Sequence, residues 1–234
     1  GLIFFSYAGD IWAVESSGGE AFPVTSHIGY DERPKLSPDG KWLAFVSSRT
    51  GNGDIYLMPW EGSDIEPSPD YPKRLTFHDA YDALDCWSPD GRWLYFNSNH
   101  DTRGTAAYKV SIEGGTPLKL FEEPFEAAFN IAVSPDGETI AFNNNGAPWW
   151  RKGPTPATSD IWLTDERASF FKKISDRPGR NLYPMWKPDG KGLYFVSDRS
   201  GCENIWFIPL EGGQPQQITR FEEGRVIRPS ISYD

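Results

Sequence analysis

The stretch Ser37-Pro38-Asp39-Gly40-Lys41-Trp42-Leu43-Ala44-Phe45-Val46 decides the fold, because its opening turn recurs three more times along the chain. The recurrences are Ser88-Pro89-Asp90-Gly91, Ser134-Pro135-Asp136-Gly137 and Lys187-Pro188-Asp189-Gly190. In such a turn proline fixes φ, aspartate can accept a hydrogen bond from the nearby backbone, and glycine allows a positive φ. We interpret the motif as a hairpin connection and its aspartates as turn formers, not as catalytic groups.

Each of these turns is followed by a similar set of apolar segments. The segments after the turn are 42–46, 93–96, 139–142 and 193–196, and the next ones are 54–58, 107–110, 160–163 and 204–208. Short fourth segments follow in places, as at 73–76 and 216–219. Four short strands in a repeat of about 45–50 residues are typical of a propeller blade. The sequence therefore predicts an all-β protein, a β-propeller of four-stranded blades.

The two ends of the chain together supply one more blade. Residues 2–6, 10–15 and 22–25 match the second, third and fourth strands of a repeat, and residues 228–234 read as an innermost strand. We predict a single domain, residues 1–234, of five blades closed by pairing of the N- and C-terminal strands. The expected blades are 1–26 with 226–234, 27–77, 78–121, 122–175 and 176–225. The alternative is part of a six- or seven-bladed propeller.

Composition excludes several classes of function. The 234 residues carry a net charge of −10, and no Lys/Arg block breaks that balance, so nucleic acid is not an expected partner. No run of eighteen apolar residues exists, so a membrane span is not expected either. Cys86 and Cys202 fall in different repeats and are expected to be free thiols. Because repeat symmetry accounts for His27 and His78, we predict no metal and no cofactor.

The repeat consensus resembles two known propellers. Ser-Pro-Asp-Gly-Lys, then Ser-x-Arg-x-Gly, then Asp-Ile-(Trp/Tyr), then Gly-Gly-x-Pro is similar to the WD-like repeat of the Tol-system periplasmic propeller and to the N-terminal propeller of tricorn-type proteases. The opening residues 6–12 and the insertion 148–152 favour the tricorn side. The resemblance implies an accessory or gating propeller, with a downstream peptidase domain as a possible partner. The sequence does not identify the compartment, although a periplasmic or extracytoplasmic location is slightly favoured over a cytoplasmic one.

No catalytic residue is predicted in this chain. A Gly-x-Ser-x-Gly elbow is missing, so no serine nucleophile can be named. In a propeller the uniform turns occupy one face, whereas longer and more variable loops occupy the other. Exposed loops on a rigid scaffold are common binding sites. The candidate ligand-binding residues on these loops are Tyr30, Arg33, Tyr81, Asp82, Trp149, Trp150, Arg151, Lys152, Arg180, Tyr183 and Arg228. The longest of these loops is expected at about residues 143–158, starting with Asn143-Asn144-Asn145.

Three functions remain open. The first is a non-catalytic module that recognises or gates peptides or a protein partner. The second is a Tol-like scaffold for protein–protein interaction. The third is a sugar-active hydrolase or lyase, for which Asp31, Asp82 and Glu126 lie near the starts of innermost strands, where paired carboxylates would act.

Overall fold

All regular secondary structure in the described residues is β. The computed structural model describes residues 1–60, 62, 71–100, 105–121, 127–145 and 158–231. No helix occurs among them, and so none that could span a membrane is found in this part of the chain. The chain divides into two compact units, residues 1–102 with 108–118 and residues 103–107 with 119–234.

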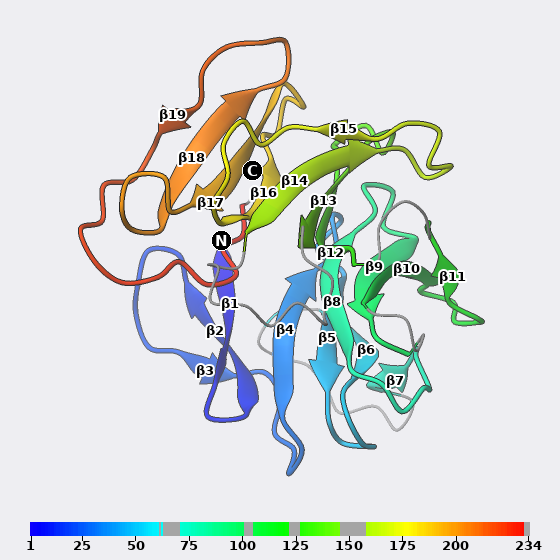
Figure 1. The fold of residues 1–234 in the computed structure, drawn as a ribbon. Coiled ribbons are helices and arrows are strands. Elements are labelled where there is room, and N and C mark those ends of the chain that lie inside the picture. Colours follow the sequence, from blue (N-terminus) through cyan, green and yellow to red (C-terminus); the bar gives the residue numbers. More distant parts are fainter. Residues whose placement is uncertain (61, 63–70, 101–104, 122–126, 146–157, 232–234) are drawn as a thin grey trace. The chain divides into compact units, whose positions relative to one another are not determined.

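The first unit holds two complete sheets and most of a third (Figure 1). The first sheet contains β1 (Leu2–Tyr7), β2 (Asp10–Glu15) and β3 (Phe22–Pro23). The second contains β4 (Asp31–Leu36), β5 (Trp42–Ser47), β6 (Asp54–Pro59) and β7 (Lys73–Arg74). The third contains β8 (Asp82–Trp87), β9 (Trp93–Ser98), β10 (Ala106–Ser111) and β11 (Leu118–Lys119).

The second unit holds the last two sheets. One contains β12 (Phe129–Val133), β13 (Ile140–Asn145), β14 (Ser159–Thr164) and β15 (Lys172–Lys173). The other contains β16 (Asn181–Trp186), β17 (Gly192–Ser197), β18 (Asn204–Pro209) and β19 (Gln216–Gln217). In every sheet consecutive strands are neighbours. The predicted all-β fold of five blades is confirmed, whereas the assignment of residues 226–234 to the first blade stays a prediction.

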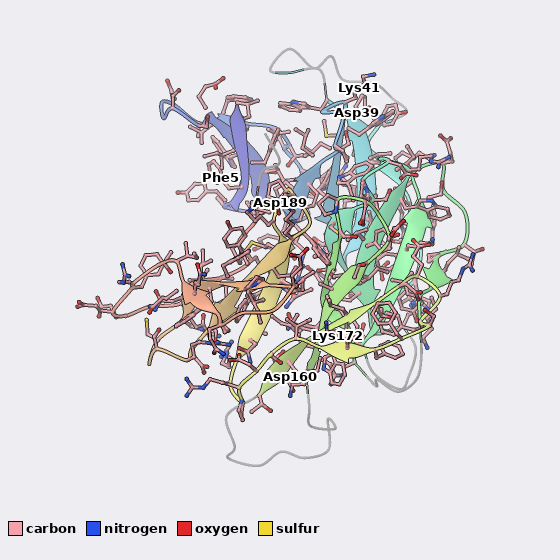
Figure 2. The ribbon with its side chains drawn as sticks, turned by 90° about the horizontal axis from the view of Figure 1, so that it is seen from above. Phe5, Asp39, Lys41, Asp160, Lys172 and Asp189 are labelled. Atoms are coloured by element: carbon pink, nitrogen blue, oxygen red, sulfur yellow. The ribbon has the colours of Figure 1, made fainter. Side chains whose placement is uncertain are left out.

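The repeated turns join the first strand of a blade to the second, as predicted. Ser37 Oγ donates to Asp39 Oδ1 at 2.6 Å and accepts from the Trp42 backbone N–H at 2.9 Å. Asp39 also accepts from the Lys41 N–H at 3.1 Å, and Figure 2 shows the two residues side by side. The same serine–aspartate bond closes the turn at Ser88, at 2.6 Å. These aspartates are therefore turn formers.

Three of the first strands carry a bulge at the same place, whereas β8 shifts register later, between Leu84 and Cys86, with no residue at positive φ. The register shifts within β4, β12 and β16, and in each strand the residue at the shift has a positive φ: Arg33 at 55°, Asn130 at 53° and Tyr183 at 54°. In the C-terminal segment, Arg228 repeats this conformation with φ at 49°. Residues other than glycine rarely adopt such positive φ angles. A bulge bends its strand and re-aims a side chain, so the repeat gives these positions one shared geometry.

One sequence expectation about the loops is wrong. Residues 143–145 were expected to open the longest loop, but they form the end of β13, where Asn143 pairs with Ile161 and Asn145 with Ser159. Asn143 itself is completely buried. The polar side chain is tolerated in the strand because its hydrogen bonds are satisfied there, as described below.

Candidate functional site

Arg33 and Tyr81 meet where β4 and β8 lie close together in the first unit. Arg33 Nε donates to the Tyr81 hydroxyl oxygen at 3.2 Å, and Nη1 donates to the Leu84 carbonyl at 3.2 Å. Nη1 also lies 3.6 Å from Asp85 Oδ1. The Tyr81 hydroxyl in turn donates to Glu32 Oε1 at 2.7 Å. Two residues that the sequence names as binding candidates are thus joined in one polar cluster.

Burial is the main influence on the protonation of Tyr81. Burial raises the pKa of the Tyr81 hydroxyl, an effect that Arg33 opposes and Glu32 reinforces. The phenol therefore keeps its proton and serves as the donor to Glu32. The side chains of Arg33 and Asp85 are 14% and 4% exposed, so the guanidinium is held by a buried counter-charge.

Asp82 is the first residue of β8 and belongs to a different environment. It is 2% exposed, and its Oδ1 atom has no hydrogen-bond partner within the described part of the chain. Burial raises the pKa of this carboxyl, although hydrogen bonds with Ser98 and Thr76 oppose the shift. Asp31 is equally buried and pairs with Arg49. Neither carboxylate is therefore presented to a substrate, as a sugar hydrolase would require.

Two arginines of the second unit share one buried carboxylate. Arg180 Nη2 and Arg225 Nε each lie 3.4 Å from Glu203 Oε1, and the Val226 N–H donates to Glu203 Oε2 at 3.1 Å. The Glu203 side chain is 8% exposed, whereas those of Arg180 and Arg225 are 33% and 58% exposed. The two arginines and one glutamate carry a net positive charge, and the arginine side chains are the exposed members of the group. It suits an anionic ligand group.

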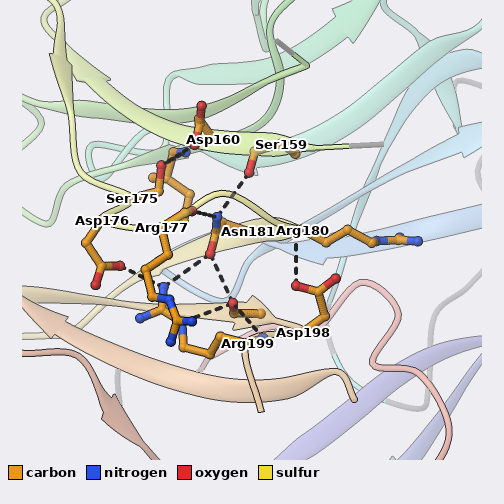
Figure 3. Close-up of polar contacts among 11 residues, drawn as sticks. Ser159, Asp160, Ser175, Asp176, Arg177, Arg180, Asn181, Asp198 and Arg199 are labelled. Carbon is orange, nitrogen blue, oxygen red and sulfur yellow. Dashed lines mark hydrogen bonds and ion pairs between the residues drawn. The ribbon is translucent and has the colours of Figure 1, made fainter. Parts of the chain in front are cut away.

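A second polar network lies behind Arg180. Asn181 Nδ2 donates to the carbonyls of Ser159 and Arg177, at 3.2 and 3.1 Å, and Arg199 Nη2 donates to Asn181 Oδ1 at 3.2 Å. Figure 3 shows that the Arg180 side chain extends away from this network, while its backbone N–H donates to Asp198. The network therefore anchors the backbone of Arg180 and leaves its guanidinium free to meet Glu203.

Tyr183 is positioned by a residue whose role the sequence does not reveal. Asn143 Oδ1 accepts from the Tyr183 backbone N–H at 2.9 Å and from Asn130 Nδ2 at 3.1 Å. Asn143 Nδ2 donates to the carbonyls of Asp160 and Asn181, at 3.1 and 2.7 Å. All four hydrogen-bonding positions of this buried amide are used. The sequence gives little signal for this role, because the matching positions of the repeat hold valine at 46 and 196 but asparagine at 97.

The remaining candidates are not brought into either cluster. Tyr30 is 72% exposed, and its N–H donates to Ser48 Oγ at 2.8 Å. Arg228 is exposed in the C-terminal segment. Five residues named from the sequence lie outside the described residues: Trp149, Trp150, Arg151, Lys152 and Glu126.

The two loop histidines have the same local role. His27 Nδ1 accepts from the Gly29 N–H at 2.9 Å, and His78 Nδ1 accepts from the Ala80 N–H at 3.2 Å. Each histidine closes a turn that leads into the next blade. Across the described ranges, no group of three or more His, Cys, Asp or Glu residues is arranged to hold a metal ion.

Known proteins match this chain over its whole length. The family model described as the tricorn protease N-terminal beta propeller domain matches residues 1–234. A tricorn protease homolog of Saccharolobus solfataricus is 26% identical over 229 residues, which cover 95% of this chain and 20% of that protein. The chain thus spans about a fifth of the length of the tricorn protease homologs of Saccharolobus solfataricus and Streptomyces coelicolor.

Solved structures show the same fold. The crystal structure of TolB from Acinetobacter baumannii superposes with a TM-score of 0.74 at 20% identity, covering 98% of this chain and 54% of that one. The crystal structure of the tricorn protease gives a TM-score of 0.68 at 22% identity, covering 94% and 21%. At this level of identity the likeness establishes the β-propeller fold.

Proposed function

The chain belongs to the family of tricorn protease N-terminal β-propeller domains, and on that premise we propose that it is a non-catalytic module that binds peptides or a protein partner for a peptidase. The match to a family model over residues 1–234 supports this function. In the tricorn protease homolog of Saccharolobus solfataricus the matched region is 20% of the protein, so we assign the peptidase activity to a region or subunit other than these blades.

The observation that carries the proposal is a bulge that three blades share and whose side chain differs among them. The left-handed position of the first strand holds Arg33, Asn130 and Tyr183 in three different blades. A scaffold that fixes the backbone and changes the side chain presents different hydrogen-bonding groups at equivalent places. This arrangement favours recognition over one conserved chemical step, since a catalytic set needs specific residues in one geometry.

The charges on the candidate residues favour a peptide ligand with anionic groups. The Arg180–Glu203–Arg225 group presents excess positive charge. Guanidinium groups bind carboxylates through charge-assisted hydrogen bonds. The exposed ring of Tyr30 adds apolar contact area of the kind that binding surfaces use.

The proposal is tested by comparing two arginine variants in a peptide-binding assay. Labelled peptides of random sequence, with free carboxyl ends or amidated ends, are titrated with the wild-type protein, Arg180→Gln and Arg92→Gln. Arg92 is the matched control because its side chain is 77% exposed at a uniform turn. We expect Arg180→Gln to weaken binding about tenfold, as the loss of a charged hydrogen bond predicts. Arg92→Gln should bind like wild type. Equal affinities for all three proteins would contradict the proposed site.

A Tol-like scaffold is the second candidate, favoured by the likeness to TolB structures. The same assay separates it from peptide binding. A scaffold would bind a folded protein partner but leave the random peptides unbound.

A further inference from the structure

The first two links between blades follow one pattern. Gly9 directly precedes β2, and Tyr30 directly precedes the next first strand, β4. A Cβ atom at Gly9 would lie 3.2 Å from Tyr30 Cδ1, so the tyrosine ring lies against the glycine. Gly53 before β6 and Tyr81 before β8 repeat this contact, with a distance of 2.6 Å to Tyr81 Cδ2. In both links the residue after the tyrosine donates its N–H to the glycine carbonyl, at 2.8 and 3.0 Å.

The link that follows the blade of β16–β19 has charged residues at the same two positions. Glu203 directly precedes β18, as the glycines precede β2 and β6. Arg225 lies three residues before Arg228, which has a φ of 49°, as Tyr30 lies three residues before Arg33, which has a φ of 55°. Arg225 Nε donates to Glu203 Oε1 at 3.4 Å, and the next backbone N–H donates to Glu203 Oε2 at 3.1 Å. A carboxylate–guanidinium contact thus replaces the contact of a tyrosine ring with a glycine.

A second arginine reaches the same carboxylate. Arg180 directly precedes β16 and therefore occupies the repeat position of Tyr30 and Tyr81. Its Nη2 atom lies 3.4 Å from Glu203 Oε1, the oxygen atom that also accepts from Arg225. Because both guanidinium groups approach one oxygen atom, they lie close enough together for one small anion to contact both.

The link between blades does not itself require the charge of Glu203. At the two earlier links a glycine carbonyl accepts the corresponding backbone N–H, so an uncharged acceptor is sufficient there. The Glu203 side chain is 8% exposed, whereas those of Arg180 and Arg225 are 33% and 58% exposed. Glu203 is therefore the buried member of the group, and a ligand would meet the guanidinium groups first.

The buried carboxylate changes which anions the two arginines suit. Two guanidinium groups and one carboxylate leave an excess of one positive charge. A ligand with one negative charge neutralises the group, whereas a ligand with two leaves an uncompensated charge beside Glu203. Like charges placed together in an interface are costly. Asp198, which accepts from the Arg180 backbone N–H at 3.1 Å, adds a further negative charge next to the site.

We propose that Glu203 determines the specificity of this site: it adapts the arginine pair to a singly charged carboxylate, such as the free carboxyl end of a peptide, and discriminates against a doubly charged phosphate group. This inference rests on the proposed function, because it names the ligand group that Arg180 and Arg225 contact. Without the charge of Glu203, the two guanidinium groups would carry two positive charges and would suit the doubly charged group better.

The test titrates the 234-residue chain with three pools of labelled random peptides at about pH 7.5, where phosphoserine carries close to two negative charges. The pools have free carboxyl ends, amidated ends, or amidated ends with phosphoserine as the last residue. Glu203→Gln keeps the size of the side chain and an oxygen atom for the Val226 N–H. This variant should raise the affinity ratio of the phosphoserine pool to the free-carboxyl pool about tenfold.

Glu223→Gln is the matched control, because it makes the same chemical change at an exposed residue two positions before Arg225. Its affinity ratio should stay within about twofold of the wild-type ratio, since salt screens exposed charges.

The inference is supported if Glu203→Gln alone shifts the affinity ratio. It is overturned if this variant leaves the ratio unchanged, or if Glu223→Gln shifts it equally. Should Glu203→Gln fail to fold, wild type still decides, because any wild-type preference for the phosphoserine pool over the free-carboxyl pool overturns the inference. Equal wild-type binding of all three pools would contradict the proposed function as well. An unchanged ratio in Glu203→Gln, with free carboxyl ends still preferred over amides, overturns the inference alone.

Discussion

The Tyr183 backbone N–H donates to Asn143 Oδ1 at 2.9 Å across 40 residues of sequence. This contact links the first strand of the last blade to the second strand of the blade before it. Because Asn130 donates to the same oxygen atom, one amide holds the left-handed residues of two adjacent blades. A binding-candidate side chain is thus positioned by a buried residue that no ligand needs to touch.

Replacing that amide should be costly. Asn143→Val introduces the residue found at positions 46 and 196 of the repeat, but it removes four hydrogen bonds of a buried group. We expect a loss of about 2–4 kcal/mol in the free energy of unfolding, since each buried polar group left unsatisfied costs about 1–3 kcal/mol. The matched control is Asn97→Val in the third blade, whose amide donates to Asp85 and Ala83. Denaturant unfolding should show the smaller loss for Asn97→Val, and the reverse order would refute the role given to Asn143.

The Asp31–Arg49 pair should show strong coupling. Arg49→Gln leaves the buried Asp31 carboxylate unpaired, and breaking a buried ion pair from one side costs about 3–5 kcal/mol. Asp31→Asn should cost less, because Asn181 makes the equivalent contact with Arg199. A double-mutant cycle with both changes measures the interaction directly. Additive effects of the two substitutions would show that the side chains do not act as a pair.

The turn aspartates should contribute stability that acid removes. The Ser88 hydroxyl is the main cause that lowers the pKa of Asp90 to about 2. A carboxyl with a lowered folded pKa stabilises the protein above its unfolded pKa of about 3.9, and this contribution disappears as pH falls towards 2. Asp90→Asn should therefore lower the thermal midpoint at pH 7 but have little effect at pH 2. An equal effect at both pH values would mean that the charge of Asp90 is irrelevant. Asp90 is well exposed, so the effect is expected to be modest.

The position of Tyr81 should depend on a glycine of the neighbouring blade. A Cβ atom at Gly53, where φ is +117°, would lie 2.6 Å from Cδ2 of the Tyr81 ring. Gly53→Ala should displace this ring and break its contacts with Arg33 and Glu32. Gly51→Ala is the control, because a Cβ there meets nothing within 4 Å and φ is also positive. We expect a larger loss of stability for Gly53→Ala, by about 1–3 kcal/mol, the range for overpacking. Similar losses would indicate backbone strain alone.

The sequence predicted the blades because their signals are local. Turn residues such as Pro38, Asp39 and Gly40 act within a few positions, and the apolar segments follow each turn at a fixed distance. The sequence also indicated Arg33 and Tyr183 as candidate ligand-binding residues. Their left-handed backbone conformation could not be predicted, because it depends on the pairing of whole strands. The polar run from Asn143 suggested a loop, since its hydrogen-bond partners lie far away in sequence and cannot be read from local pattern.

The third-blade histidine shows a signal that alignment of the repeats does contain. His100 falls where Arg49 and Arg199 stand, two positions after a serine that pairs with the first strand. The burial of Asp82, with one oxygen atom that has no partner among the described residues, is visible only in the structure. The roles proposed for Trp149 and its neighbours stay predictions.

The most direct measurement for the proposed function is calorimetric titration of the 234-residue chain with random peptides, followed by mass spectrometry of the same mixture. A non-catalytic recognition module predicts saturable binding, stronger for peptides with free carboxyl ends, and intact peptides afterwards. Cleaved peptides, or the absence of saturable binding to every peptide pool, would contradict the account.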